Sequence, residues 1–89
     1  MYLKKLQVLE LFCCEIISDD GVIRILSDEN IVSLKFVNLN QTNITDSTLI
    51  AVSRQKHLKG LKKFWVNSCH HLTITGVSAL IDTWILEGI

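Results

Sequence analysis

Three segments of this chain carry nearly the same pattern of residues. They begin at Leu6, Leu34 and Leu61, so the pattern returns after 28 residues and then after 27. A period in this range is typical of a solenoid, in which similar units stack on one another and bury a shared core. Solenoids present broad surfaces rather than deep pockets. The repeat therefore predicts both the fold class and the kind of function to look for.

Each unit opens with apolar residues at every second position. Such alternation is typical of a short strand with one buried face. Because successive units stack in the same direction, their equivalent strands should run parallel and form one sheet. The alternating apolar residues are Leu9 and Leu11, Val37 and Leu39, and Phe64 and Val66.

A polar turn and then an apolar pattern at helical spacing follow each strand. Ser18, Thr45 and Thr73 stand just before the helical patterns, where a hydroxyl group can accept from the free N–H groups of the first turn. Asp19 and Asp46 come next and suit the positive end of the helix dipole. The helical apolar residues are Val22, Ile25 and Leu26, then Leu49, Ala51 and Val52, then Val77, Leu80 and Ile81.

The whole chain is predicted to be one domain, residues 1–89. It divides into about three strand–loop–helix units, approximately 6–33, 34–60 and 61–89. A chain of this length buries only roughly 60–65% of its unfolded surface, but 48% hydrophobic residues provide enough material for a core. The expected fold is an α/β solenoid with a parallel sheet on its concave face. Trp84 is expected to pack on the last helix as core or cap.

The first unit reads Leu-x-x-Leu-x-Leu-x-x-Cys-x-x-Ile-Ser-x-x-Gly-Val-x-x-Ile. It resembles the cysteine-containing leucine-rich repeat. Unit two departs from the pattern, because Thr42 replaces the cysteine, Thr48 replaces the glycine and the loop is one residue shorter. Unit three matches in register at Cys69, Leu72, Thr73, Gly76, Val77 and Leu80.

This resemblance implies a function as well as a fold. The subtype is typical of F-box/leucine-rich-repeat proteins, the substrate receptors of cullin-type ubiquitin ligases. The F-box is a separate segment that contacts the ligase adaptor, and it is not among the three units. A link to ubiquitin ligases is therefore implied by the resemblance rather than by any residue of the repeats.

Charge and cysteine content narrow the range of partners and compartments. Nine basic and nine acidic residues cancel, which disfavours binding to nucleic acid or to an anionic membrane. No apolar run is long enough to span a bilayer. Three cysteines form no disulfide framework, so we expect an intracellular protein, cytoplasmic or nuclear.

The cysteines invite a metal or an enzymatic interpretation, which the spacing disfavours. Cys14 and Cys69 lie two units apart, so their backbones should be roughly 10 Å apart, and the usual zinc-ligand spacings are missing. Cys69 and His70 are sequence neighbours, whose side chains point apart on a strand. We therefore expect no metal, no cofactor and no catalytic residue. Instead, Cys14, Thr42 and Cys69 should form an inward-facing ladder that hydrogen-bonds the backbone.

The residues between the inward positions of the strands should face outward. They form a three-by-three grid that is rich in aromatic residues, which are the residues that anchor interfaces. We predict that this concave grid binds a protein, although missing parts of a longer protein could equally cover it. The grid consists of Val8, Glu10, Phe12, Phe36, Asn38, Asn40, Lys63, Trp65 and Asn67.

Two functional hypotheses follow. The first is a protein–protein interaction module, with substrate recognition in a cullin/F-box ubiquitin ligase as its specific form. The alternative is a fragment or divergent copy of a longer leucine-rich-repeat protein with a purely structural role. The apolar first strand, Leu6–Phe12, leaves an open edge, so self-association through the ends of the array is also expected.

Overall fold

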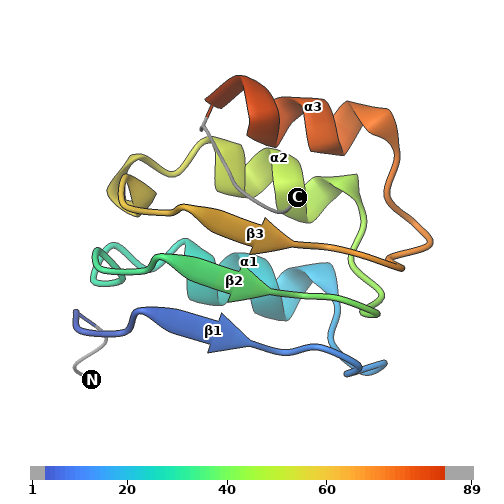
Figure 1. Cartoon of the computed structure of the whole chain (residues 1–89), viewed down its shortest axis with the longest axis horizontal. Helices are drawn as coiled ribbons and strands as arrows, with labels where there is room; N and C mark the ends of the chain where they lie inside the picture. The colour runs from blue at the N-terminus through green and yellow to red at the C-terminus, as the bar shows by residue number, and fades with distance from the viewer. Residues whose placement is uncertain (1–3, 84–89) are drawn as a thin grey trace.

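The computed structural model describes residues 4–83; the expected packing of Trp84 and the last residues of unit three lie outside that range. Strands and helices alternate along the chain, as the repeat predicts (Figure 1). The elements are β1 (Val8–Glu10), α1 (Asp19–Leu26), β2 (Phe36–Asn38), α2 (Asp46–Ser53), the 3₁₀ turn η1 (Lys56–Leu58), β3 (Lys63–Trp65) and α3 (Ile74–Thr83).

The three strands form one parallel sheet in the order β1-β2-β3. Val8 is aligned with Phe36, and Phe36 with Lys63. These offsets equal the two sequence periods, so each unit contributes one strand in the same register. The predicted α/β solenoid of about three units with a parallel sheet is confirmed.

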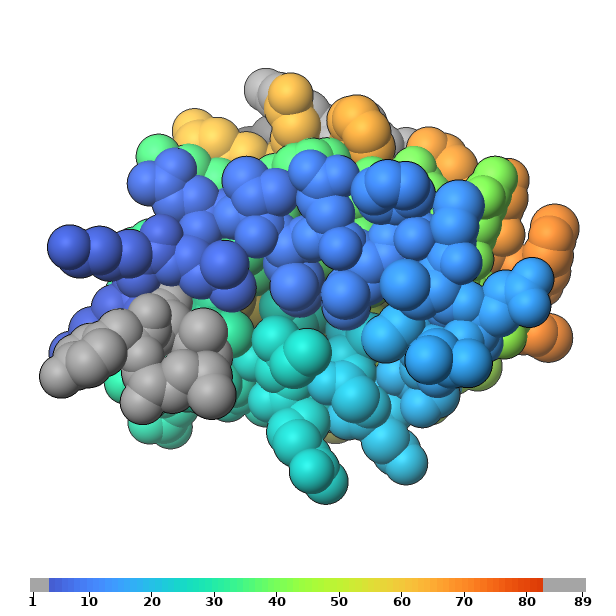
Figure 2. Space-filling view, turned by 90° about the horizontal axis from the view of Figure 1, so that it is seen from below, coloured from blue at the N-terminus to red at the C-terminus, as the bar shows by residue number. Residues whose placement is uncertain are grey.

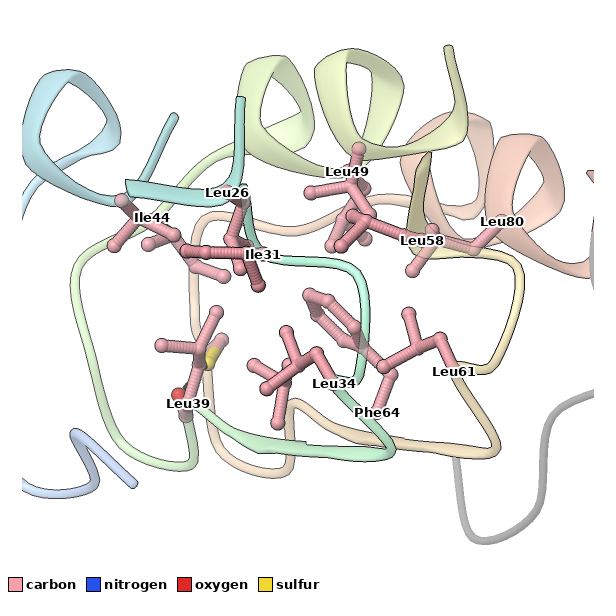
Figure 3. Close-up of a cluster of buried hydrophobic side chains, with 14 residues drawn as sticks. Leu26, Ile31, Leu34, Leu39, Ile44, Leu49, Leu58, Leu61, Phe64 and Leu80 are labelled. Atoms are coloured by element: carbon pink, nitrogen blue, oxygen red, sulfur yellow. Dashed lines mark hydrogen bonds between the residues drawn. The ribbon is translucent and has the colours of Figure 1, made fainter. Parts of the chain in front are cut away.

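The hydrophobic core lies between the sheet and the helices (Figure 3). Burial of one large aliphatic or aromatic side chain contributes about 1.5–3 kcal/mol, so this layer dominates stability. Of the fourteen buried hydrophobic residues in the described range, unit two supplies seven: Leu34, Val37, Leu39, Ile44, Leu49, Val52 and Leu58. The others are Val22, Leu26, Ile31, Leu61, Phe64, Cys69 and Leu80.

Unit one is less well buried than unit two. Its inward residues Leu6, Leu9, Leu11 and Ile17 are only partly covered, although they pack against the core. Figure 2 looks onto this end of the solenoid, where β1 and the following loop form much of the surface. Within residues 4–83 no strand pairs with the outer edge of β1. Its unpaired backbone groups and apolar side chains remain accessible there.

Two helical residues depart from the expected apolar faces. Ile25 and Ile81 were expected to lie with the buried residues of α1 and α3, yet both side chains are exposed. Val22 and Leu26 already fill the space beneath α1, and Leu80 is buried beneath α3. Helical spacing predicted the helices correctly but overestimated the width of their buried stripes.

A left-handed residue follows each strand at the same position of the repeat. Cys13, Gln41 and Ser68 have φ angles of 61°, 58° and 60°. This conformation costs roughly 1–2 kcal/mol for a residue other than glycine. It directs the N–H of Cys13 to the carbonyl of Asn40, and that of Gln41 to the carbonyl of Asn67, each at 2.9 Å. The strained turn thus joins neighbouring units.

A second link between units runs along the N-terminal ends of the helices. Asp19 accepts hydrogen bonds from the N–H of Thr45 at 2.8 Å, from its Oγ1 at 2.6 Å, and from Oγ1 of Thr48. Asp46 likewise accepts from the N–H of Thr73 at 2.8 Å and from its hydroxyl group. Each aspartate therefore binds the next unit, a role that the helix-dipole argument did not predict.

These aspartates also explain which of the predicted helix caps form. The hydroxyl oxygens of Thr45 and Thr73 accept from the N–H groups of Ser47 and Thr75, each at 3.2 Å, so both predicted caps are confirmed. The cap predicted at Ser18 is wrong, because its side chain makes no capping hydrogen bond. Thr45 and Thr73 are held in place by an aspartate of the preceding unit, whereas no described unit precedes Ser18.

The same hydrogen bonds change the acidity of the two aspartates. Partial burial raises the pKa of Asp19, but the hydrogen bonds from Thr45 and Thr48 outweigh it, and the pKa lies below its ordinary value. The hydrogen bonds from Thr73 hold the pKa of Asp46 below its ordinary value as well. Both carboxylates therefore stabilise the fold most when they are ionised.

Glycine is needed at one of two equivalent helix positions. A Cβ atom at Gly76 would lie 2.4 Å from Oδ1 of Asp46 and 3.0 Å from its Cα. A Cβ atom at Gly21 would have nothing within 4 Å. Gly76 therefore allows the carboxylate of unit two to approach unit three, while Gly21 has no such neighbour in the described structure.

The two glycines should respond oppositely to alanine. We expect Gly21→Ala to raise the free energy of unfolding by about 0.5–1 kcal/mol, because alanine favours the helix. Gly76→Ala should lower it by about 1–3 kcal/mol, because the added methyl group displaces Asp46 and its backbone. Urea denaturation followed by circular dichroism measures both values. Equal changes in the two variants would contradict the close approach at Gly76.

Asp19 should matter more than its neighbour Asp20. Asp19→Ala leaves the buried hydroxyl group of Thr48 and the N–H of Thr45 without their acceptor, which should cost about 1 kcal/mol after allowance for solvent. Asp20 lies in the same helical turn and is exposed. Asp20→Ala is therefore the matched control, with little expected effect.

Equal losses in these two variants would assign the effect to the helix dipole instead. The pH dependence of the free energy of unfolding provides a second measurement. Because the folded pKa is depressed, the contribution of Asp19 is present above the ordinary pKa of about 3.9 and is lost as the pH falls below it. Stability should decline less steeply over this range in Asp19→Ala than in the wild-type protein.

Candidate interaction surface

The nine predicted surface residues follow the strand register closely. Val8, Phe36 and Lys63 are aligned across the sheet, and so are Glu10, Asn38 and Trp65. Residues between them in sequence, such as Leu9, Val37 and Phe64, belong to the core cluster. Alternate residues of a strand point to opposite faces. The six aligned positions therefore lie on the sheet face opposite the helices.

Asn38, the predicted centre of this grid, is not an exposed residue. Only 7% of it is accessible, so the expectation that it belongs to an open surface is wrong. Its Oδ1 accepts from the N–H of Asn40 at 3.0 Å, and Oδ1 of Asn40 accepts from the N–H of Asn67 at 2.6 Å. Asn38 belongs to the central strand β2, with β1 and β3 on either side. Its side-chain oxygen fixes the backbone that follows β2.

Apolar and aromatic side chains make up much of the rest of this face. Val8 is 47% exposed and Phe12 is 50% exposed. Phe36 and Trp65 are half-buried, on neighbouring strands, and their ring centroids lie 4.7 Å apart at an interplanar angle of 72°. Such an edge-to-face pair contributes about 0.5–1.5 kcal/mol beyond its buried area. The two rings are therefore held in place before any partner arrives.

A hollow of about 300 Å³ lies beside this aromatic pair. Its described lining is formed by Phe36 and Trp65, together with the residues Lys35, Lys62 and Lys63. Sequence reasoning placed Phe36, Lys63 and Trp65 on this surface but missed Lys35 and Lys62. Those two lysines immediately precede β2 and β3, so the alternation of strand residues gave no reason to include them.

A second, polar hollow of about 580 Å³ lies near the loops that follow the strands. Its lining carries amide, hydroxyl and imidazole groups. Both amides are already engaged, because Nδ2 of Asn43 donates to the carbonyl of Glu15 at 2.7 Å and Oε1 of Gln41 accepts from the thiol of Cys13 at 2.6 Å. No sequence motif pointed to this hollow. Its described lining residues are Glu15, Gln41, Thr42, Asn43, Ser68 and His70.

The predicted inner ladder forms at two of its three positions. Oγ1 of Thr42 donates to the carbonyl of Leu39 at 2.8 Å, and the thiol of Cys69 donates to the same carbonyl at 3.0 Å. Thr42 and Cys69 also contact each other at 3.7 Å. Cys14 is half-buried and makes no such hydrogen bond within the described part of the chain. Thr42 and Cys69 are therefore structural residues.

Among residues 4–83 no three His, Cys, Asp or Glu side chains come close enough to hold a metal ion. All three cysteines are free thiols. In the same range no helix combines the length and the apolar character needed to cross a membrane.

Comparison with known proteins supports the repeat class. A family model described as Leucine Rich repeat matches residues 2–26. The matched range includes β1, the following loop and α1, which together make up one unit. A comparison with curated proteins finds no significant match. Since the matched unit recurs twice more in the same strand register, the fold is that of a small leucine-rich-repeat solenoid.

Proposed function

We propose that this chain is a protein-binding module that uses the sheet face opposite its helices. Leucine-rich-repeat solenoids are in general protein–protein interaction modules, and residues 2–26 match that repeat. The observation that carries the choice of face is the aromatic pair of Phe36 and Trp65. It lies beside exposed Val8 on a face that the helices leave uncovered.

The composition of this face indicates a binding site rather than an ordinary solvent-exposed surface. Single exposed apolar residues are normal on any protein. Here they are contiguous across strands, and contiguous apolar patches mark interaction sites. Tryptophan is among the residues that most often dominate binding energy. Because Trp65 is already packed against Phe36, little conformational entropy is lost when a partner binds it.

We further propose a specific setting for this module, namely substrate recognition in a cullin/F-box ubiquitin ligase. The support is the resemblance to the cysteine-containing repeat, together with the burial of Cys69 and its hydrogen bond to Leu39. Free thiols at Cys13, Cys14 and Cys69 suit a reducing, intracellular compartment, the cytoplasm or the nucleus.

A second candidate function is structural, as one part of a longer leucine-rich-repeat array. The partial exposure of Leu6, Leu9 and Leu11 favours it, because another unit stacked on β1 would cover them. A second copy of this chain could cover the same edge. Size-exclusion chromatography of the purified protein distinguishes this self-association from a monomer.

Trp65→Ala should abolish most partner binding. We expect a loss of at least about 2 kcal/mol, because a packed aromatic side chain at the centre of an interface is removed. Affinity capture from cell extract with mass spectrometry identifies the partner, and titration with the purified partner gives the affinity. A captured partner whose cullin-dependent degradation slows when the protein is depleted from cells would support the ligase setting, and a partner whose turnover does not depend on the protein would contradict it.

Two controls make this result interpretable. Ile25→Ala removes an exposed apolar side chain from α1 on the helical side and should leave capture unchanged. Lys63→Ala alters an exposed residue of the hollow that has little structural role, so it tests the face even if Trp65→Ala unfolds. Unchanged capture by both Trp65→Ala and Lys63→Ala would exclude this face.

A further inference from the structure

We infer that the hollow beside Phe36 and Trp65 binds an acidic protein segment that carries one large apolar side chain. The inference rests on the proposed function, because it names the chemistry of the partner for the same face. Two features carry it: the aromatic wall of the hollow and the lysines around it.

The size and the wall of the hollow suit a single apolar side chain. About 300 Å³ is at the small end of ligand-binding cavities, which are typically about 300–1,000 Å³. The Phe36 and Trp65 rings meet edge to face, so the pair offers a fixed apolar surface. A leucine or phenylalanine side chain placed there would remove apolar area from water on both partners.

Every charged residue in the described lining of the hollow is a lysine. Lys35, Lys62 and Lys63 are exposed, and none of the five lining residues is acidic. No ion pair joins these lysines to another residue within 4–83. The chain as a whole has no net charge, so the lysines represent a local concentration of positive charge. A partner with carboxylates beside its apolar side chain would be complementary to it.

Two of the chain's carboxylates, those of Asp19 and Asp46, lie away from this hollow. Asp19 and Asp46 begin helices α1 and α2, which puts them at the carboxyl ends of the strands. Lys35 and Lys62 precede strands β2 and β3, at the opposite edge of the sheet (Figure 1). An acidic segment bound at the hollow is thus attracted by the lysines without facing Asp19 or Asp46.

A protein segment fits this hollow better than a single-stranded nucleic acid. Bases bind by stacking on open aromatic faces along an extended basic groove. Here the two rings are half-buried and pack edge to face against each other. The positive charge is confined to three lysines, and the exposed carboxylate of Glu10 lies on the same sheet face. Tighter binding of a single-stranded oligonucleotide than of an acidic peptide is therefore the alternative outcome of the test.

The test uses the full chain and a set of short synthetic peptides. Three peptides have a central phenylalanine, flanked by glutamates in the first, glutamines in the second and lysines in the third. A fourth peptide has glutamates around a central serine. Fluorescence anisotropy of labelled peptides measures binding at low and high salt. We expect the glutamate–phenylalanine peptide to bind at least about tenfold more tightly than the other three, and more weakly as salt rises.

Charge reversal at the hollow should invert this preference. Lys35→Glu/Lys63→Glu should weaken binding of the glutamate–phenylalanine peptide at least about tenfold and strengthen binding of the lysine–phenylalanine peptide. Lys56→Glu/Lys59→Glu changes the net charge equally at exposed lysines in and next to η1, outside the hollow, and should retain the wild-type order.

Several results would overturn the inference. Two concern the peptides: equal binding of the glutamate, glutamine and lysine peptides, or no binding of the glutamate–phenylalanine peptide at about 1 mM. The others are equal effects of the two charge-reversed variants, or tighter binding of a thymidine oligonucleotide than of the glutamate–phenylalanine peptide. If capture of the natural partner still depends on Trp65, such a result rejects the acidic segment alone. If capture is independent of Trp65 and Lys63, the proposed function fails as well.

Discussion

The structure depends on one constraint: a single repeat unit cannot bury its own apolar face. A strand of three residues and a helix of eight form one side of a core, and the other side must come from the neighbouring units. Unit two has a neighbour on each side and supplies half of the hydrophobic residues that are buried within 4–83. Its sheet hydrogen bonds run to β1 and to β3. The stability of the solenoid is therefore concentrated in its middle unit.

The contacts of unit two with its neighbours explain why it departs from the repeat pattern. Thr42 replaces a cysteine and hydrogen-bonds the Leu39 carbonyl, which also accepts from Cys69 of the next unit. Thr48 replaces a glycine and donates to Asp19 of the preceding unit. Thr48 thus adds a hydrogen bond across a unit boundary, and Thr42 contacts Cys69 of the next unit. The stacking also forms the hollow beside the aromatic pair, since Phe36 belongs to one unit and Trp65 to the next.

Much of the fold could be predicted because the period and the alternation are global patterns. The spacing of Leu6, Leu34 and Leu61 gave the strand register correctly. Local features without a residue signature could not be predicted. Glycine usually marks a left-handed turn, but Cys13 and Gln41 occupy such turns, where hydrogen bonds to the next unit compensate the strain. The burial of Asn38 depends on its position between two strands, which a one-dimensional pattern does not describe.

The concentration of stability in unit two can be tested at one pair of equivalent positions. Leu39 is fully buried in unit two, whereas Leu11 occupies the same position of unit one and is only partly covered. Urea denaturation of Leu39→Ala should show a loss of about 2–5 kcal/mol, and Leu11→Ala should lose less than about half of that. Equal losses at the two positions, or a larger loss at Leu11, would contradict this account.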